Sequence, residues 1–379
     1  MFKRTEESKL TSWFFEIDRR LLYVVLLMIA IGMFFAVSAG SVAAERINQP
    51  WYFFIAKALP FYAIGIATLF ITSLLNKKTI LTISIVDVVV GIVLLGVTVV
   101  APHVIKGSAR FVSVGPFNVL PSDIMKPGFI MLTAWFLAQM RHRFGEKMFI
   151  VRGAWRIHWF SWWTYILLFI PTLVIILTHP DVGTSLLYLG VLMIMLLISG
   201  LPWSVFGGMI GAGLGMLVFA YYTMPHVHGR IETLLTGTGD TYQVTQSVQA
   251  IQHGGLFGRG EDAFIKQSLP DAHTDFIYAA IVEDMGAIMA CLLLGLLLYM
   301  LKLLVTDALN ARDRFVFYAV GGTAALFGIQ SCINLVSTLH LFAPKGMTLP
   351  FISYGGSSLV GFCLLFGMVL AIVREDKWK

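Results

Sequence analysis

The chain of 379 residues is poor in charge and in cysteine. Asp, Glu, Lys and Arg make up only 13% of it, whereas a soluble globular chain carries roughly 25%. Hydrophobic residues make up 58%, which is too much to hide from water, so a soluble fold is excluded. The three cysteines, Cys291, Cys332 and Cys363, lie inside apolar runs, which argues against a disulfide framework. Nucleotide-binding glycine, CxxC and HExxH signatures are also missing.

Long, continuous apolar runs are what the sequence does contain. Strands that cross an outer membrane alternate apolar and polar residues, so continuous runs favour helices. A spanning helix needs roughly 20 apolar residues. The sequence therefore predicts an all-α, polytopic membrane protein of about ten spans in a single domain, 1–379. The predicted spans are 21–42, 51–75, 79–101, 121–140, 161–178, 182–200, 203–223, 275–303, 314–341 and 350–373.

The distribution of Lys and Arg predicts the orientation of these spans. Nine of the 27 basic residues lie on one side of the membrane or in the nearby ends of the spans: Arg46, Lys57, Lys106, Arg110, Lys126, Arg230, Arg259, Lys266 and Lys345. The other 18 lie in short loops and tails on the opposite side, where the positive-inside bias operates. We therefore expect cytoplasmic tails at 1–18 and 374–379 and an outward-facing loop at 224–274, between spans 7 and 8. The net charge of +6 is explained by this bias and does not indicate nucleic acid.

The loop at 224–274 carries most of the polar chemistry of the predicted outer face. Loops of this length in compact proteins are usually functional or disordered. Hydrophobic residues recur along it, so we expect it to fold onto the bundle. Its glycines in QHGGLFGRG (252–260) either form ordinary turns or let the backbone approach a ligand.

Asp275 is the most informative single residue, because it precedes the apolar run at 276–301. It could cap that helix, as could Thr274. It could also be a carboxylate at the water–lipid boundary that accepts a proton from a substrate hydroxyl. Glu283 and Asp284 lie two turns further in, and acidic residues within a span are functional candidates. Function and ion pairing inside the bundle are both open for four further charged residues: Asp87, Asp123, Lys126 and Asp181.

Five motifs occur in order along the chain. They are KGSARFVSVGPFNVLPSDIMKP (106–127), HPDVGTSLL (179–187), YQVTQSVQAIQHGGLFGRG (242–260), LPDAHTDFIYAAIVEDMG (269–286) and KGMTLPFISYGGSSL (345–359). Together they resemble the SEDS family (shape, elongation, division and sporulation), and its division members more than its elongation members. The resemblance extends from Asp18 to Val373. Leu120 stands where the family usually has Gln, and Asp123 stands where it has Glu, which keeps the charge.

The resemblance implies a peptidoglycan glycosyltransferase, a hexosyltransferase of cell-wall biogenesis that polymerises lipid II at the outer face of the bacterial cytoplasmic membrane. A sugar hydroxyl of lipid II would attack the anomeric carbon of a glycan linked to undecaprenyl pyrophosphate and invert it. Asp275 would be the general base, and basic residues would stabilise the leaving pyrophosphate. The residues expected to bind substrate are Arg110, Asp123, Lys126, Arg259, Lys266, His273 and Lys345.

The resemblance also implies partners and a location. A class B penicillin-binding protein would crosslink the glycan, together with other membrane proteins of the division complex at the septum. The sequence requires no cofactor. A divalent cation, magnesium or manganese, could bind the leaving pyrophosphate. Two other functions stay open: a flippase that moves lipid II across the bilayer, and a non-catalytic scaffold of the division complex. A flippase needs polar residues along a path through the bilayer, whereas the motif charges gather on the outer side.

Overall fold

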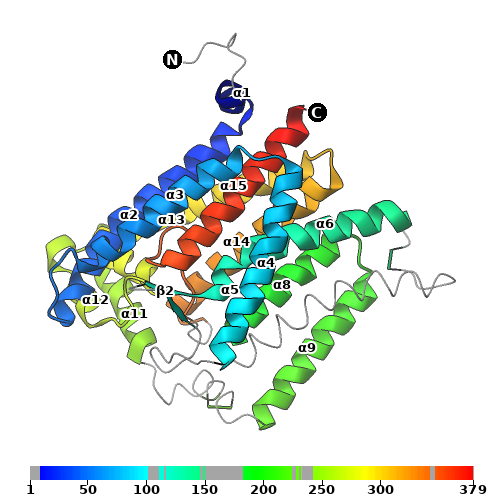
Figure 1. The fold of residues 1–379 in the computed structure, drawn as a ribbon. Helices are drawn as coiled ribbons and strands as arrows, with labels where there is room; N and C mark the ends of the chain where they lie inside the picture. Colours follow the sequence, from blue (N-terminus) through cyan, green and yellow to red (C-terminus); the bar gives the residue numbers. More distant parts are fainter. Residues whose placement is uncertain are drawn as a thin grey trace.

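The computed structural model of the chain describes residues 9–100, 111–114, 117–145, 148–149, 182–223, 228–229, 232, 242–341 and 346–378. These residues are mostly helical, which confirms the all-α prediction, and the long helices form one bundle (Figure 1). The helices are α1 (Lys9–Glu16), α2 (Arg19–Arg46), α3 (Phe53–Ser73), α4 (Lys77–Val100), α5 (Pro121–Ile124), α6 (Lys126–Phe144), α8 (Val182–Ile198), α9 (Trp203–Thr223), α11 (Tyr242–Gly254), α12 (Ile265–Ser268), α13 (Ile277–Leu309), α14 (Arg314–Thr338) and α15 (Gly356–Trp378).

Six of the described helices are long and apolar enough to cross a bilayer: α2, α3, α4, α13, α14 and α15. Each falls on a predicted span, so the chain is a polytopic membrane protein. Helices α6, α8 and α9 coincide with three more predicted spans. The predicted span at 161–178 lies outside the described residues, so the number ten stays a prediction.

Two predicted spans begin later than the apolar pattern suggested. The run at 121–140 is divided into the short helix α5 and then α6, whose second residue is Pro127, a position where proline is tolerated. The run at 350–373 becomes helical only at Gly356. The residues before it turn, because Phe351 has a φ of 64° and Ser353 Oγ accepts the N–H of Leu349 at 2.8 Å.

A small hairpin is the one described departure from the all-helical expectation. Strands β1 (Val112–Val114) and β2 (Phe117–Val119) pair antiparallel, with Val112 opposite Val119. Their β-branched and aromatic residues at alternate positions suit a strand. The hairpin lies within the first SEDS-like motif and leads directly into α5.

The carboxy-terminal helix α15 forms the centre of the bundle. In the most apolar stretch of α15, 83% of the residues are buried inside the protein, whereas in that of α3 only 22% are buried. The ring of Phe351 packs on those of Phe362 and Phe366 at 5.5 and 5.0 Å between ring centroids. The segment before α15 is therefore packed against the helix that follows it, and α15 itself packs against α3, α14, α5 and α6.

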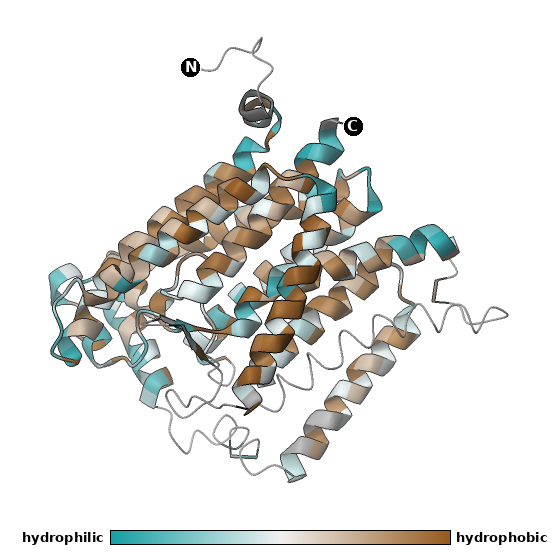
Figure 2. Ribbon diagram, viewed as in Figure 1, coloured by the Kyte–Doolittle hydropathy of each residue, from teal (hydrophilic) through white to brown (hydrophobic). Residues whose placement is uncertain are grey.

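Helix α1 and the end of α15 lie at one end of the bundle, the terminal end, and α11 and α12 lie at the opposite end (Figure 1). Figure 2 shows hydrophobic residues along the long helices and hydrophilic residues near their ends. At the terminal end, Lys377 Nζ donates to Asp18 at 2.7 Å and to Asp307 at 3.0 Å. Helix α1, within the predicted tail, is held there because Trp13 Nε1 donates to Ser73 Oγ at 2.9 Å.

Candidate active site

The start of α13 is built around a turn at Asp271. This residue has a φ of 52°, and aspartate tolerates the left-handed region better than most side chains. Its carbonyl oxygen accepts the N–H groups of Thr274 and Asp275, at 3.0 and 3.1 Å. The N-cap position of α13 is Phe276, and no side chain caps the helix there. The capping interpretation of Asp275 and Thr274 is therefore wrong for this structure.

Asp275 lies half-buried between α14 and the segment that follows α14. Its carbonyl oxygen accepts a hydrogen bond from Asn334 Nδ2 at 2.8 Å. Its carboxylate lies against Gly346, where an added Cβ would stand 2.7 Å from Oδ2. A side chain at position 346 would have to displace this carboxylate, so the KGMTLP motif and Asp275 are packed against each other.

Two amide side chains on α14 connect the predicted motifs, and the sequence analysis did not select either. Asn334 Nδ2 also donates to the carbonyl of Met347 at 2.6 Å. One turn earlier, Gln330 Nε2 donates to the carbonyl of Thr348 at 2.9 Å. Gln330 is 1% exposed and Asn334 is 1% exposed. Two polar amides four residues apart in an apolar helix are the signal that could have identified them.

Lys126 reaches the same face of α14 from α6. Its ammonium donates to Asp123 Oδ1 at 2.6 Å and to Gln330 Oε1 at 2.9 Å. The Lys126 side chain is 7% exposed and that of Asp123 is 13% exposed. Because Gln330 and Asn334 are about 6 Å apart along the helix axis, Lys126 and the Asp275 backbone bind neighbouring turns of α14. The structure thus brings Asp123, Lys126 and Asp275 together.

Asp87 has a different task from the ion pairing considered for it. Its Oδ2 accepts the N–H of Gly128 at 2.8 Å, so a carboxylate on α4 satisfies an amide in the first turn of α6. Gly128 has no room for a side chain, because an added Cβ would stand 2.7 Å from the same Oδ2. A carboxylate at a helix N-terminus is favourable. Asp87 therefore positions the turn that carries Lys126.

His273 is buried in an aromatic cluster beside Asp275. Its ring centroid lies 4.7 Å from that of Phe54 and 5.4 Å from that of Tyr354. Its carbonyl accepts the N–H of Tyr354 at 2.9 Å. The contacts connect the turn before α13 with α3 and with the FISYGGSS segment. The small residues of FISYGGSS (351–358) allow close packing, because an added Cβ at Gly356 would stand 2.6 Å from the ring of Phe61.

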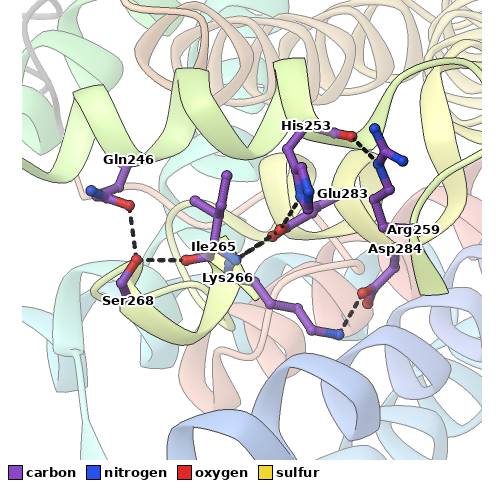
Figure 3. A network of polar contacts seen from close by, with 8 residues as sticks. All are labelled: Gln246, His253, Arg259, Ile265, Lys266, Ser268, Glu283 and Asp284. Carbon is purple, nitrogen blue, oxygen red and sulfur yellow. Dashed lines mark hydrogen bonds and ion pairs between the residues drawn. The ribbon is translucent and has the colours of Figure 1, made fainter. Parts of the chain in front are cut away.

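A second cluster of polar side chains, the Glu283 group, joins the loop to Glu283 on α13 (Figure 3). The Glu283 side chain is fully buried and accepts three hydrogen bonds. His253 Nδ1 lies 2.9 Å from Oε1, and the backbone N–H groups of Ile265 and Lys266 donate at 2.8 and 2.6 Å. A buried carboxylate is tolerated when donors satisfy it in this way. Glu283 therefore fastens α11 and the start of α12 to α13.

Lys266 and Arg259, two predicted substrate ligands, belong to this second group. Lys266 Nζ pairs with Asp284 (Figure 3). The other carboxylate oxygen of Asp284 accepts a hydrogen bond from Ser38 Oγ at 2.9 Å. Lys266 is thus held in an ion pair that is about 10% exposed on both sides. Arg259 is exposed, and its Nε donates to the carbonyl of His253 at 2.8 Å.

Glycines let this loop sit directly on the backbone of α13. Helix α13 is interrupted at Gly286, which has a φ of 81°. Ala287 donates its N–H to the carbonyl of Gly255 at 2.9 Å. Side chains at Gly254, Gly258 or Gly286 would overlap the facing backbone. The close approach allowed by QHGGLFGRG is thus to α13.

Two predicted substrate ligands, Arg110 and Lys345, lie outside the described residues, as does Asp181. No cluster of three or more His, Cys, Asp or Glu side chains that could hold a metal ion occurs among the described residues. The possible divalent cation stays a prediction.

Comparison with known proteins assigns the chain to a family. The model of the cell cycle protein family of FtsW, RodA and SpoVE matches residues 18–378. The chain belongs to this family. The resemblance inferred from the five motifs is therefore confirmed.

Two curated relatives cover nearly the whole chain. The probable peptidoglycan glycosyltransferase FtsW of Caulobacter vibrioides is 33% identical, over 99% of this chain and 93% of the relative. The stage V sporulation protein E of Bacillus subtilis is 30% identical, over 96% and 98%.

Solved structures share the fold. A chain from a peptidoglycan synthase complex that coordinates polymerization and crosslinking has a TM-score of 0.77 at 23% identity, covering 96% of this chain and 99% of that one. The rod shape determining protein RodA of Thermus thermophilus has a TM-score of 0.65 at 23% identity, covering 95% and 97%.

Proposed function

We propose that this chain is a peptidoglycan glycosyltransferase that polymerises lipid II, with Asp275 as the general base. The observation that carries the proposal is the setting of Asp275. Its carboxylate is half-buried at the end of the bundle away from the termini, it does not cap its helix, and Asn334 holds its backbone. A base positioned by its neighbours and still partly accessible is what proton removal from a sugar hydroxyl requires.

The reaction follows from this arrangement. The Asp275 carboxylate takes the proton of the acceptor hydroxyl while the hydroxyl oxygen forms a bond to the donor's anomeric carbon. The bond from that carbon to the pyrophosphate oxygen breaks, and its electron pair leaves with the pyrophosphate. Attack from the face opposite the leaving group inverts the carbon.

Positive charge near the pyrophosphate lowers the barrier to its departure. Lys126 is joined to Asp275 through α14, and Arg259 is an exposed cation among the described residues of the loop. Arg110, Lys266 and Lys345 complete the proposed set, with Lys266 available once its pair with Asp284 opens. A divalent cation bound by the pyrophosphate would add to the same effect.

The proposed setting is the bacterial cytoplasmic membrane at the division septum, with both termini in the cytoplasm. A class B penicillin-binding protein is the proposed partner, because a glycan strand must be crosslinked after it is made. Support comes from the likeness to a chain of a complex that coordinates polymerization and crosslinking.

Polymerisation of lipid II by the purified protein in detergent or nanodiscs tests the proposal. We expect glycan strands on a gel, and more of them when the transpeptidase is added. The same preparation in sealed vesicles is assayed for transfer of labelled lipid II between leaflets. Leaflet transfer without polymer would establish the flippase function instead. If the protein showed neither activity in the presence of the partner, the non-catalytic scaffold would be the remaining function.

Cysteine labelling in intact cells tests the orientation. Single cysteines at hydrophilic positions in 236–262 should react with an impermeant maleimide, and cysteines in 142–158 should not. Reaction at the second set would overturn the assignment of the outer face.

A further inference from the structure

The loop between α11 and α12 ends in an apolar tip. Leu256 is 66% exposed and Phe257 is 80% exposed. Two adjacent large apolar side chains at such exposure are unfavourable in water, at about 25 cal/mol for each Å² left uncovered. Both belong to the polar end of the bundle, where a side chain facing water would be expected to be hydrophilic.

The tip is fixed to α13 and has no room to retract. The carbonyls of Gly255 and Leu256 accept the N–H groups of Ala287 and Ile288 at 2.9 and 3.3 Å. An added Cβ at Gly286 would meet the carbonyl of Leu256. The tip therefore stays beside the interruption of α13, whatever covers its side chains.

The helix beyond this interruption presents an apolar surface. Ile288, Leu292 and Leu298 are 50%, 64% and 58% exposed. In a helix apolar enough to cross a bilayer, such side chains face lipid. The backbone N–H of Ile288 donates to the carbonyl of Leu256 in the tip. The apolar surface of Leu256 and Phe257 therefore continues the lipid-facing surface of α13.

The length of α13 sets the depth of the tip. Asp307 lies 21 positions after Gly286 in the helix, and at a rise of 1.5 Å per residue this corresponds to about 32 Å. The hydrocarbon core of a bilayer is about 30 Å thick. Asp307 is bound by Lys377 at the polar terminal end, so Gly286 and the tip lie close to the opposite boundary of the hydrocarbon.

We propose that the Leu256–Phe257 tip inserts into the outer leaflet and anchors the α11–α12 loop to the membrane surface. The apolar side chains enter the acyl-chain boundary, while Arg259 and Glu261, exposed on the same loop, remain among the headgroups. This anchoring does not depend on the reaction proposed for Asp275. Its consequence is that the Glu283 group and Lys266 are held at the level of the lipid headgroups.

Spin labelling measures the depth directly. Phe257→Cys and, as the matched control in the same loop, Glu261→Cys are made in a chain in which Cys291, Cys332 and Cys363 are replaced by Ala. After reconstitution in vesicles of phosphatidylethanolamine and phosphatidylglycerol, nitroxide relaxation by oxygen and by a water-soluble nickel chelate is compared. The label at 257 should lie about 5–10 Å below the phosphates, whereas that at 261 should favour nickel. Equal nickel access at the two sites would overturn the proposal.

Photocrosslinking with the native cysteines in place provides the second measurement. Benzoylphenylalanine at position 257 or 261 is irradiated in membranes, and adducts are identified by mass spectrometry. Phospholipid adducts at 257 and few or none at 261 are expected. A protein adduct at 257 as the main product would show that a partner, and not lipid, covers the tip, and would also overturn the proposal.

Discussion

Asp275 and Glu283 lie eight residues apart at the start of the same helix, yet their surroundings differ completely. Glu283 is fully buried, and three donors satisfy its carboxylate. Asp275 is half-buried, its carbonyl accepts a hydrogen bond from Asn334, and its carboxylate lies against Gly346. A fully buried carboxylate saturated with fixed donors stabilises structure, whereas a half-buried carboxylate can be reached by a substrate and exchange a proton with it. The comparison separates a structural acid from a chemical one.

Asp275→Asn should show the largest effect. The amide keeps the size of the side chain but cannot take the proton, so polymerisation should fall by ~10²–10⁴-fold. The fold should stay intact, because asparagine keeps the size of the side chain and its capacity to form hydrogen bonds. Lipid II polymerisation and thermal unfolding of purified protein check both. A variant that polymerised at the wild-type rate would remove the base assignment and direct attention to Asp271 or Asp123.

Asn334→Leu should have the next largest effect, although Asn334 is uncharged. It removes the hydrogen bonds to the carbonyls of Asp275 and Met347, and a misplacement of about 1 Å can cost ~10²-fold in rate. Ser337→Ala is the matched control on α14, because Ser337 Oγ is buried with no hydrogen-bond partner within the described part of the chain. Equal losses of kcat in the two variants would show that α14 tolerates no change and that Asn334 has no special role.

Glu283→Gln should affect the loop more than the chemistry. Glutamine has an NH2 group in place of one carboxylate oxygen, so one of the N–H groups of Ile265 and Lys266 loses its acceptor, and an unsatisfied buried donor costs about 1–3 kcal/mol. Hydrogen exchange at one or both of these amides should therefore speed up by ~5–150-fold, with little change at the helical amides of α14. Unchanged protection at 265 and 266 would show that Glu283 does not fasten the loop.

Asp18 extends the comparison to the terminal end and should show the smallest effect. Burial by itself raises the pKa of Asp18, but the hydrogen bonds from Lys377 and from the Leu21 N–H outweigh it and hold the pKa below 3.8. A lowered folded-state pKa stabilises the protein above the unfolded value, and this contribution disappears as the pH falls through the folded-state value.

Asp18→Asn caps α2 about as well as aspartate, so it removes the charge and little else. The variant should be slightly less stable at pH 5–7, with a constant difference, and the difference should shrink below pH 3.8. Thermal unfolding in detergent across this range measures it. A difference that grew with acidity would contradict the sign.

Local features of the sequence predicted the elements well. Apolar runs located α2, α13 and α14 because spanning length and hydropathy are properties of consecutive residues. The same reasoning failed before Gly356, where the positive φ of Phe351 breaks an apolar run that reads as helix. Asp275 was identified because a carboxylate next to an apolar helix is conspicuous in the sequence itself.

Contacts between distant residues were decided only by the tertiary structure. Lys126 meets Gln330 across 204 residues, and Asn334 meets Asp275 across 59. Glu283 and Asp275 look alike in the sequence as acids near the start of one span, and only packing gives the first its three donors. By itself the sequence determined the membrane class, the family and the candidate base, because these depend on composition and motifs. The partners of each polar group depend on which helices pack together, and no local pattern contains that information.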